Sequence, residues 1–275
     1  MNQLNKEKTA RVIACLCDGN SIRATARIAD VSINTVVKIL VKAGTACKEY
    51  HDTHVRNISA KRVQCDEAWS FVYAKEKNVP ANMKGQDGVG SVWTWVGLDA
   101  DSKLAISYFV GNRDAEAALA FMQDIEARLT SRVQLTTDGL RAYLEAVDEV
   151  FGSNIDFAQL IKLYGNAPEG EHRYSPAECT GAKKTAITGN PDDKHISTSY
   201  IERQNLTMRM SMRRFTRLTN AFSKKFENHK HAIALYFMHY NFVRIHKTTR
   251  VTPAMAAGVT NRLWEISDLV DLISK

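Results

Sequence analysis

Apolar residues recur at helical spacing through the first 45 residues of the chain, with short polar breaks between them. Ser21 and Ser32 each precede such an apolar segment, and a serine there caps a helix by accepting a hydrogen bond from a free backbone N–H. The pattern therefore predicts three helices, of which the second spans 22–29 and the third 33–42. We expect the third helix to end at Gly44, because glycine is common just beyond the last turn of a helix.

A polar stretch with several cations and histidines follows these helices. We interpret residues 46–61 as a linker, which makes residues 1–45 a separate all-α domain. The spacing of the second and third helices, with a short turn between them, matches a helix-turn-helix. The alternative interpretation is an ordinary three-helix bundle used for dimerisation.

Beyond residue 61 the pattern changes to runs rich in Val, Trp, Phe and Tyr, which favour strands. Five strands are predicted, over 62–73, 89–99, 104–111, 133–137 and 157–164. Two helices are predicted between them, over 114–129 and 140–150. Three antiparallel strands followed by alternating helices and parallel strands is the order of an RNase H-like fold. We therefore predict an α/β fold: an RNase H-like domain with a mixed five-stranded sheet, preceded by the helix-turn-helix domain.

Residues 165–197 are polar, contain three prolines and show no clear period. This stretch is too long for an ordinary connection, so it is either a functional insertion or a mobile flap. Helical periodicity returns over 198–214 and 222–245. We divide this part of the chain into a catalytic domain over 62–220 and a C-terminal helical region over 221–275.

The charge of the chain adds information about its partner. Hydrophobic residues make up 44% of the 275 residues, enough for a packed core, and the net charge is +7. A basic balance suits a polyanionic partner, nucleic acid first. The five cysteines show no disulfide spacing, and neither a leader nor a membrane-length apolar run is visible. We expect a cytoplasmic, reduced protein with no membrane partner.

Three acids fall where the predicted fold would bring them together. Asp66 lies in the first predicted strand, Asp138 directly follows the fourth, and Glu202 lies early in the helix that begins at 198. In an RNase H-like sheet the first and fourth strands are neighbours, and the last helix packs across them. Carboxylates of this kind suit Mg²⁺ or Mn²⁺, and two such ions can promote attack on a phosphodiester. Each acid alone also fits a plain structural role at a turn or a helix N-terminus.

Three motifs around these acids resemble those of the DDE transposases of bacterial insertion sequences, above all the insertion-sequence-one-like family. The motifs are Asp66-Glu67-Ala68-Trp69, Thr137-Asp138-Gly139 and Tyr200-Ile201-Glu202-Arg203-Gln204-Asn205-Leu206. The resemblance covers about residues 65–241. It implies that Asp66, Asp138 and Glu202 are the catalytic residues and the metal ligands, with two Mg²⁺ or Mn²⁺ ions at the site.

The same resemblance implies an activity and its partners. The protein would bind the terminal inverted repeats of its mobile element and catalyse metal-dependent DNA 3′-end cleavage and strand transfer. Its partners would be double-stranded DNA, both element ends and target. Because two ends must be handled together, we expect a homodimer or a higher homo-oligomer, located at the bacterial nucleoid.

One departure from the family concerns the third acid. Compact members of the family have a shorter run between the second Asp and the Glu, which would make 165–197 an insertion. Glu171 or Glu178 could then be the third acid. We prefer Glu202, because among these three only Glu202 lies in a predicted helix beside Arg203 and Asn205.

Two groups of residues are predicted to contact DNA. In the helix-turn-helix, Ile28, Val31, Val36 and Leu40 would form the core, which leaves the start of the third helix free for base edges. The predicted contacts there are Ser32, Asn34, Thr35 and Lys38, with Arg23 and Arg27 on the phosphate backbone. The second group is a run of one sign beside the third acid, which suits a phosphate track. It comprises Arg203, Arg209, Arg213, Arg214 and Arg217, and the neutral Asn205 is predicted to contact DNA with them.

Two other functions fit the same features. One is a catalytically inactive, sequence-specific DNA-binding regulator that kept the fold. The other is a stand-alone RNase H-like nuclease, which would cut DNA but not join it. Metal-dependent chemistry distinguishes the regulator from the two enzymes.

Overall fold

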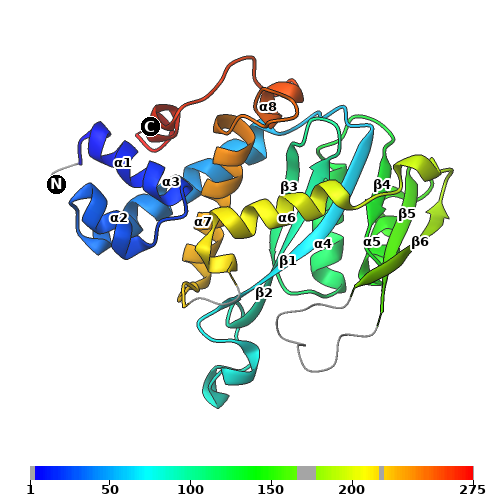
Figure 1. The fold of residues 1–275 in the computed structure, drawn as a ribbon, viewed down its shortest axis with the longest axis horizontal. Coiled ribbons are helices and arrows are strands. Elements are labelled where there is room, and N and C mark those ends of the chain that lie inside the picture. The colour runs from blue at the N-terminus through cyan, green and yellow to red at the C-terminus, as the bar shows by residue number, and fades with distance from the viewer. Residues whose placement is uncertain (1–3, 166–177, 217–219, 275) are drawn as a thin grey trace.

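A mixed β-sheet forms the centre of one half of the molecule, in a computed structural model that describes residues 4–165, 178–216 and 220–274 (Figure 1). Its strands are β1 (Arg62–Val72), β2 (Gly90–Asp99), β3 (Ala105–Gly111), β4 (Gln134–Thr137), β5 (Asp156–Tyr164) and β6 (Cys179–Thr188). Their spatial order is β3-β2-β1-β4-β5-β6. The first three strands are antiparallel, β1, β4 and β5 are parallel, and β6 runs antiparallel to β5. The strand order predicted from the sequence is confirmed, and it fits an RNase H-like sheet.

The predicted number of five strands is wrong, because the sheet has a sixth strand. β6 lies within 165–197, the segment predicted to be an insertion without regular structure. Its side chains are mostly exposed on both faces, so no apolar alternation marks it in the sequence. Main-chain hydrogen bonds to β5 hold it at the edge of the sheet.

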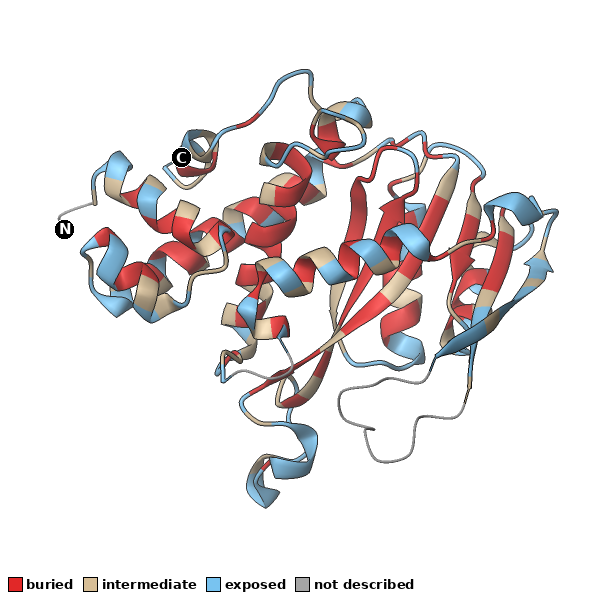
Figure 2. Ribbon diagram, viewed as in Figure 1, coloured by how far each residue is buried: buried red, intermediate tan, exposed pale blue. Residues whose placement is uncertain are grey.

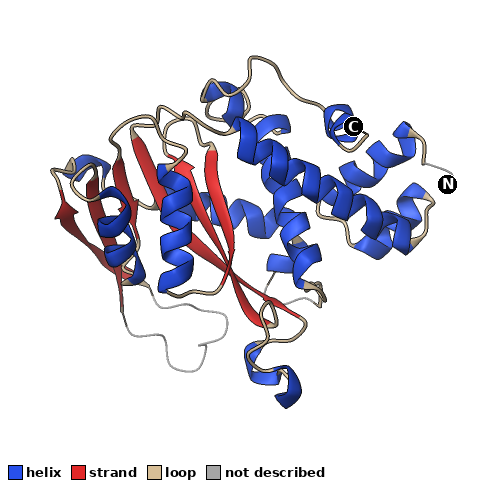
Figure 3. Cartoon of the chain, turned by 180° about the vertical axis from the view of Figure 1, so that it is seen from behind, coloured by secondary structure: helices blue, strands red, loops and turns tan. Residues whose placement is uncertain are grey.

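Helices cover both faces of this sheet. α4 (Ala115–Glu126) and α5 (Ala142–Phe151) pack against each other on the face seen in Figure 3. α6 (Ser199–Ser211) crosses the opposite face and contacts β1 and β2 (Figure 1). The central strands of the sheet are thus enclosed between helical layers.

The N-terminal part contains the three predicted helices, α1 (Lys6–Cys17), α2 (Ile22–Ala29) and α3 (Ile33–His54). Both predicted caps are confirmed: the Ser21 hydroxyl accepts from the backbone N–H of Ala24 at 3.1 Å, and that of Ser32 from Thr35 at 3.0 Å. Ile28 is 51% exposed, so its predicted place in the core is wrong. The small residues of α2 face α1 and α3 instead, which turns Ile28 outward.

The predicted end of the third helix at Gly44 is also wrong, because α3 continues to His54. Gly44 is a crossing point rather than a cap. A Cβ atom at Gly44 would lie 2.4 Å from the Cβ of His231 on α7 (Phe226–Met238), so only glycine permits this approach. Most of the segment predicted as a linker is therefore the second half of α3, where Lys48, Glu49, Thr53 and His54 are exposed and His51 is buried.

The end of α3 is fixed to the sheet domain by a buried arginine. The Arg128 side chain is 2% exposed, and its guanidinium donates to the carbonyl oxygen of Val55 at 3.0 Å. It also forms ion pairs with Asp52 on α3 and Asp124 on α4. A buried guanidinium with partners on two helices resists their separation, since each broken bond would leave a buried polar group unpaired.

The C-terminal region returns to both parts of the molecule. The helix predicted over 222–245 is α7 followed by a π-helical turn over His239–Val243. In that turn the Asn241 side chain bonds both backbone groups of Ala105 on β3, each at 3.0 Å. Two short helices follow, α8 (Pro253–Ala256) and α9 (Ile266–Leu272), and α9 packs on α1. Short 3-10 turns complete the chain, at Glu76–Asn78, Ala81–Met83, Asp193–His195 and Arg213–Phe215.

One hydrophobic core runs through the N-terminal helices, α7 and the sheet layers (Figure 2). Among the described residues, no helix is long and apolar enough to cross a lipid bilayer.

We predict that Gly44→Ala lowers the free energy of unfolding. Helix propensity alone would make alanine stabilising by about 1 kcal/mol. The new methyl group would overlap His231, and overpacking of this kind costs about 1–3 kcal/mol, so we expect a net loss of about 1 kcal/mol. Urea denaturation measures the change. Thr45→Ala, at the exposed neighbouring position, is the control, and a more stable Gly44→Ala variant would contradict the close crossing.

Candidate active site

The register of two neighbouring strands brings the first two predicted acids together. β1 and β4 pair in parallel, and their last matched residues are Cys65 and Thr137. Asp66 and Asp138 are the next residues on the two strands. β4 ends at Thr137, whereas β1 continues to Val72, so Asp138 follows the end of β4 and lies beside Asp66 in the middle of the sheet, as the sequence predicted.

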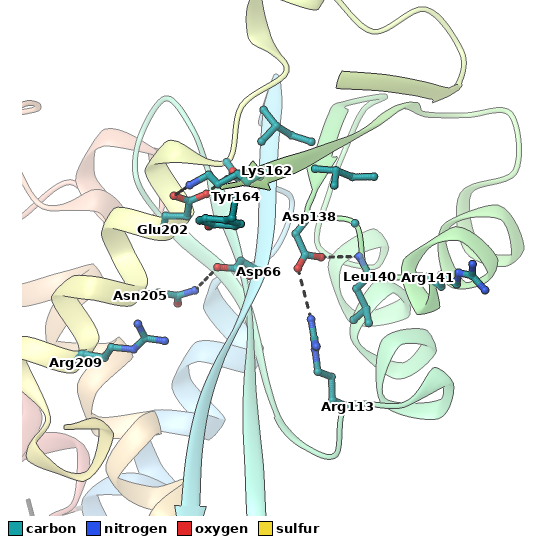
Figure 4. A pocket seen from close by; sticks show the side chains of 14 residues that line it. Asp66, Arg113, Asp138, Leu140, Arg141, Lys162, Tyr164, Glu202, Asn205 and Arg209 are labelled. Carbon is teal, nitrogen blue, oxygen red and sulfur yellow. Dashed lines mark hydrogen bonds and ion pairs between the residues drawn. The ribbon is translucent and has the colours of Figure 1, made fainter. Parts of the chain in front are cut away.

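A third acid joins them. Asp66, Glu67 and Asp138 each offer a carboxylate oxygen, and these oxygens all lie within 4.8 Å of one another. The group borders a cleft of about 820 Å³ that is lined by Asp66, Asp138 and Glu202, all three half-buried (Figure 4). The cleft is lined by Asp66, Arg113, Asp138, Gly139, Leu140, Arg141, Leu160, Ile161, Lys162, Tyr164, Thr198, Glu202, Asn205 and Arg209.

Asp66 is half-buried and is held by α6. The Asn205 side-chain amide donates to its Oδ2 at 2.9 Å. Burial, and next the charge of Asp138, raise the pKa of Asp66 to about 6, although the hydrogen bond from Asn205 acts against this shift. The charged form of Asp66 is therefore disfavoured in this site, and a bound cation would stabilise it.

Glu67 is the residue that the sequence analysis missed. Its side chain is 1% exposed. The Tyr143 hydroxyl donates to one carboxylate oxygen, and the Arg113 Nε donates to the other at 3.0 Å. Burial, and next the charge of Asp138, raise the pKa of Glu67 to about 7. Adjacent residues of a strand point to opposite faces of the sheet, so the sequence pattern provides no reason to group Glu67 with Asp66. The one signal in the sequence was the presence of a second acid in an apolar strand.

Asp138 is placed by its own turn and by a shared arginine. Its Oδ1 accepts from the backbone N–H of Leu140 at 2.9 Å. Its Oδ2 lies 3.5 Å from the Arg113 Nη2, and the Arg113 guanidinium lies over the Trp93 ring at 4.7 Å. One cation therefore serves both Glu67 and Asp138, and Figure 4 shows its ion pair with Asp138.

Glu202 lines the same cleft but is not part of the three-acid group. Its carboxylate forms an ion pair with Lys162 on β5 and accepts from the Thr198 hydroxyl at 2.6 Å. Of the two alternative third acids, Glu178 is exposed and does not line the cleft, and Glu171 lies outside the described residues.

The donor set fits a hard divalent cation such as Mg²⁺ or Mn²⁺. Three carboxylates at mutual distances below 5 Å provide the oxygen ligands that these ions prefer. In addition, the amide oxygen of Asn205 is buried and has no hydrogen-bond partner among the described residues. A polar atom left unpaired beside a group of acids is accounted for by a cation or its bound water.

The predicted DNA-contacting residues after Glu202 differ in their surroundings. Arg203 and Arg213 are exposed, and Arg209 lines the cleft. Asn205 is buried against Asp66, so it acts within the site. Arg214 is half-buried and donates to the Ser223 hydroxyl at 2.8 Å and to the Asn228 carbonyl. Arg217 lies outside the described residues.

The predicted contacts at the N-terminus lie on α2 and at the start of α3. All of them except Thr35 are exposed: Arg23, Arg27, Ser32, Asn34 and Lys38. The hydroxyls of Ser32 and Thr35 are hydrogen-bonded to each other at 2.9 Å, as part of the helix cap.

No protein-family model matches the chain, and no curated protein matches it in sequence. Structures with a partial likeness include the "Mos1 transposase paired-end complex with left transposon end", at 16% identity and a TM-score of 0.24, and "a pre-cleavage Mos1 transpososome", at 12% and 0.23. Each match covers 57% of this chain and 60% of the other, so the chain spans about three fifths of those Mos1 chains. The "Mos1 Strand Transfer Complex" matches at 13% identity and a TM-score of 0.24, over 87% and 78% of the two chains. At scores this low, the likeness does not define the function of this chain.

The raised pKa values of Asp66 and Glu67 predict that stability falls as the pH rises. Both acids hold their protons more tightly in the folded than in the unfolded chain, so their contribution is complete below about pH 4 and is lost as the pH passes 6 to 7. For Glu67 the loss is on the order of 3 kcal/mol. We expect Glu67→Gln to flatten this part of the stability curve, measured by urea denaturation from pH 4.5 to 8 without divalent metal. The exposed Glu149→Gln is the control, and an unchanged slope in Glu67→Gln would refute the assignment.

Proposed function

We propose that the chain is a DNA transposase, which binds the terminal inverted repeats of its mobile element and catalyses metal-dependent 3′-end cleavage and strand transfer. The observation that carries the proposal is the meeting of Asp66, Asp138 and Glu202, from two parallel strands and a crossing helix, in one cleft. The same cleft contains four cationic side chains, which suit a polyanionic substrate.

Asp66 and Asp138 would hold the metal, since they are adjacent and face the cleft. Glu202 would complete the set on the resemblance to DDE transposases, and the proximity of Glu67 to both aspartates supports it as a further ligand. Two bound Mg²⁺ or Mn²⁺ ions would supply Lewis-acid activation of the attacking hydroxyl and stabilisation of the leaving oxygen.

The other residues of the cleft act on binding and orientation. Asn205 fixes the rotamer of Asp66, and Lys162 neutralises Glu202. Arg141 and Arg209 border the opening and would attract the phosphodiester backbone. A positioned substrate strand is what a phosphoryl transfer of this kind requires most, because reaction depends on in-line geometry.

Recognition of double-stranded DNA is assigned to the N-terminal helices and the basic run after Glu202. The exposed Asn34 and Lys38 near the start of α3 suit base edges, and Arg23 and Arg27 suit phosphates. Pairing of two element ends in a homodimer or larger homo-oligomer, at the bacterial nucleoid, belongs to the same proposal.

The test uses purified protein, a labelled duplex carrying the element's end, and Mg²⁺ or Mn²⁺. We predict that Asp66→Asn and Asp138→Asn each lower 3′-end cleavage and strand joining by at least about 100-fold, because the metals lose a ligand, while end binding is kept. Asp148→Asn, at an exposed position of α5, is the matched control. If the wild type binds the end without metal-dependent chemistry, the result contradicts the transposase and favours the inactive regulator. Cleavage without strand joining favours the stand-alone nuclease.

Glu67→Gln and Glu202→Gln then separate the two further acids. We expect Glu202→Gln to abolish chemistry, as the motif implies, and Glu67→Gln to weaken binding of Mn²⁺ measured by calorimetry or electron paramagnetic resonance. Chemistry that survives in Glu202→Gln but fails in Glu67→Gln would assign the third catalytic carboxylate to Glu67.

A further inference from the structure

An aromatic side chain stands at the mouth of the acid-bearing cleft. Tyr164 is the last residue of β5, is 60% exposed, and lines the cleft with Asp66 and Glu202. Figure 4 shows its ring in the same opening as these two carboxylates. An exposed tyrosine on its own needs no explanation, but one that faces a charged cleft is placed to meet what binds there.

The strand geometry accounts for this position. Lys162 and Tyr164 are two residues apart on β5, so their side chains leave the same face of the sheet. Lys162 reaches across to Glu202 on α6. Tyr164 is the last residue of β5 and lines the same cleft, and none of the ring contacts found between described residues involves it.

The remaining lining has the composition of a nucleotide site. Cationic groups suit phosphates, and the apolar side chains Leu140, Leu160 and Ile161 suit a base or sugar. A cleft of about 820 Å³ is within the range of small-ligand sites, which fits one or two nucleotides. In a duplex the base faces are covered by stacking on their neighbours, so a ring at the cleft mouth could stack only on a base that has left the helix.

We propose that Tyr164 stacks on an unpaired nucleobase next to the phosphodiester held at the acids. The site then accepts a strand whose terminal nucleotides are unpaired, and Tyr164 is a positioning residue that holds the opened strand. This inference rests on the proposed function, because it takes DNA as the ligand.

The experiment uses end duplexes with 2-aminopurine at successive positions from the end, in Ca²⁺ so that binding is separated from chemistry. When the base leaves the helix its fluorescence rises, and stacking on tyrosine quenches it again. For wild type we expect a quenched signal at one position near the cleavage site. Tyr164→Ala should give a bright signal there and bind roughly 5- to 150-fold more weakly, and Tyr164→Phe should match the wild type.

Tyr73→Ala is the control, since Tyr73 is also an exposed tyrosine but does not line the cleft. It should behave as the wild type. Equal fluorescence and affinity in Tyr164→Ala and the wild type would overturn the proposal, as would loss of quenching in Tyr164→Phe. Because this readout needs no cleavage, a normal Tyr164 effect in a protein without metal-dependent chemistry would refute only the transposase function. Chemistry without a Tyr164 effect would refute only the stacking.

Discussion

Parallel pairing of the central strands β1 and β4 brings the carboxylates of Asp66 and Asp138 close together, and several neighbouring side chains compensate for their repulsion. Like charges in a half-buried place repel each other and lose water, which is why the pKa values of Asp66 and Glu67 are raised. Neighbouring elements supply the compensation: an amide from α6, a hydroxyl from α5, and one arginine from the loop before α4. The helices on the two faces of the sheet are therefore linked through the acids as well as through the core.

The sequence was informative where chemistry and secondary structure coincide. The proximity of Asp66 and Asp138 could be predicted, because the sequence pattern predicts both strands and their pairing. The ion pair of Glu202 with Lys162 could not, since it depends on how far α6 is rotated over β5. Glu67 was missed because neighbouring residues of a strand point to opposite faces of the sheet. Asp138 follows the end of the short strand β4, and its carboxylate lies close to those of both Asp66 and Glu67.

Gly44 illustrates how one residue type supports two opposite structures. Glycine ends helices because it tolerates a left-handed backbone, and it permits helix crossings because it lacks a side chain. Sequence alone does not distinguish these uses. The partner decides, and here it is His231, which is 187 positions away in the chain and cannot be foreseen from local pattern. β6 is a second example, because its position is determined by main-chain pairing with β5 rather than by a local sequence pattern.

An uninterrupted α3 has a consequence for how DNA would be measured. Its 22 residues extend about 33 Å at the usual helical rise, from the proposed base-reading turn to the Arg128 network beside the sheet. That span is close to one turn of B-form DNA, about 10 base pairs. If the N-terminal helices bind the DNA sequence and the acidic cleft cuts the strand, as proposed, a continuous α3 would fix the distance between the two. The phosphate that is cut would then lie at a set number of base pairs from the recognised sequence. Inserted or deleted bases between the two would put the phosphate out of reach and on the wrong side of the duplex.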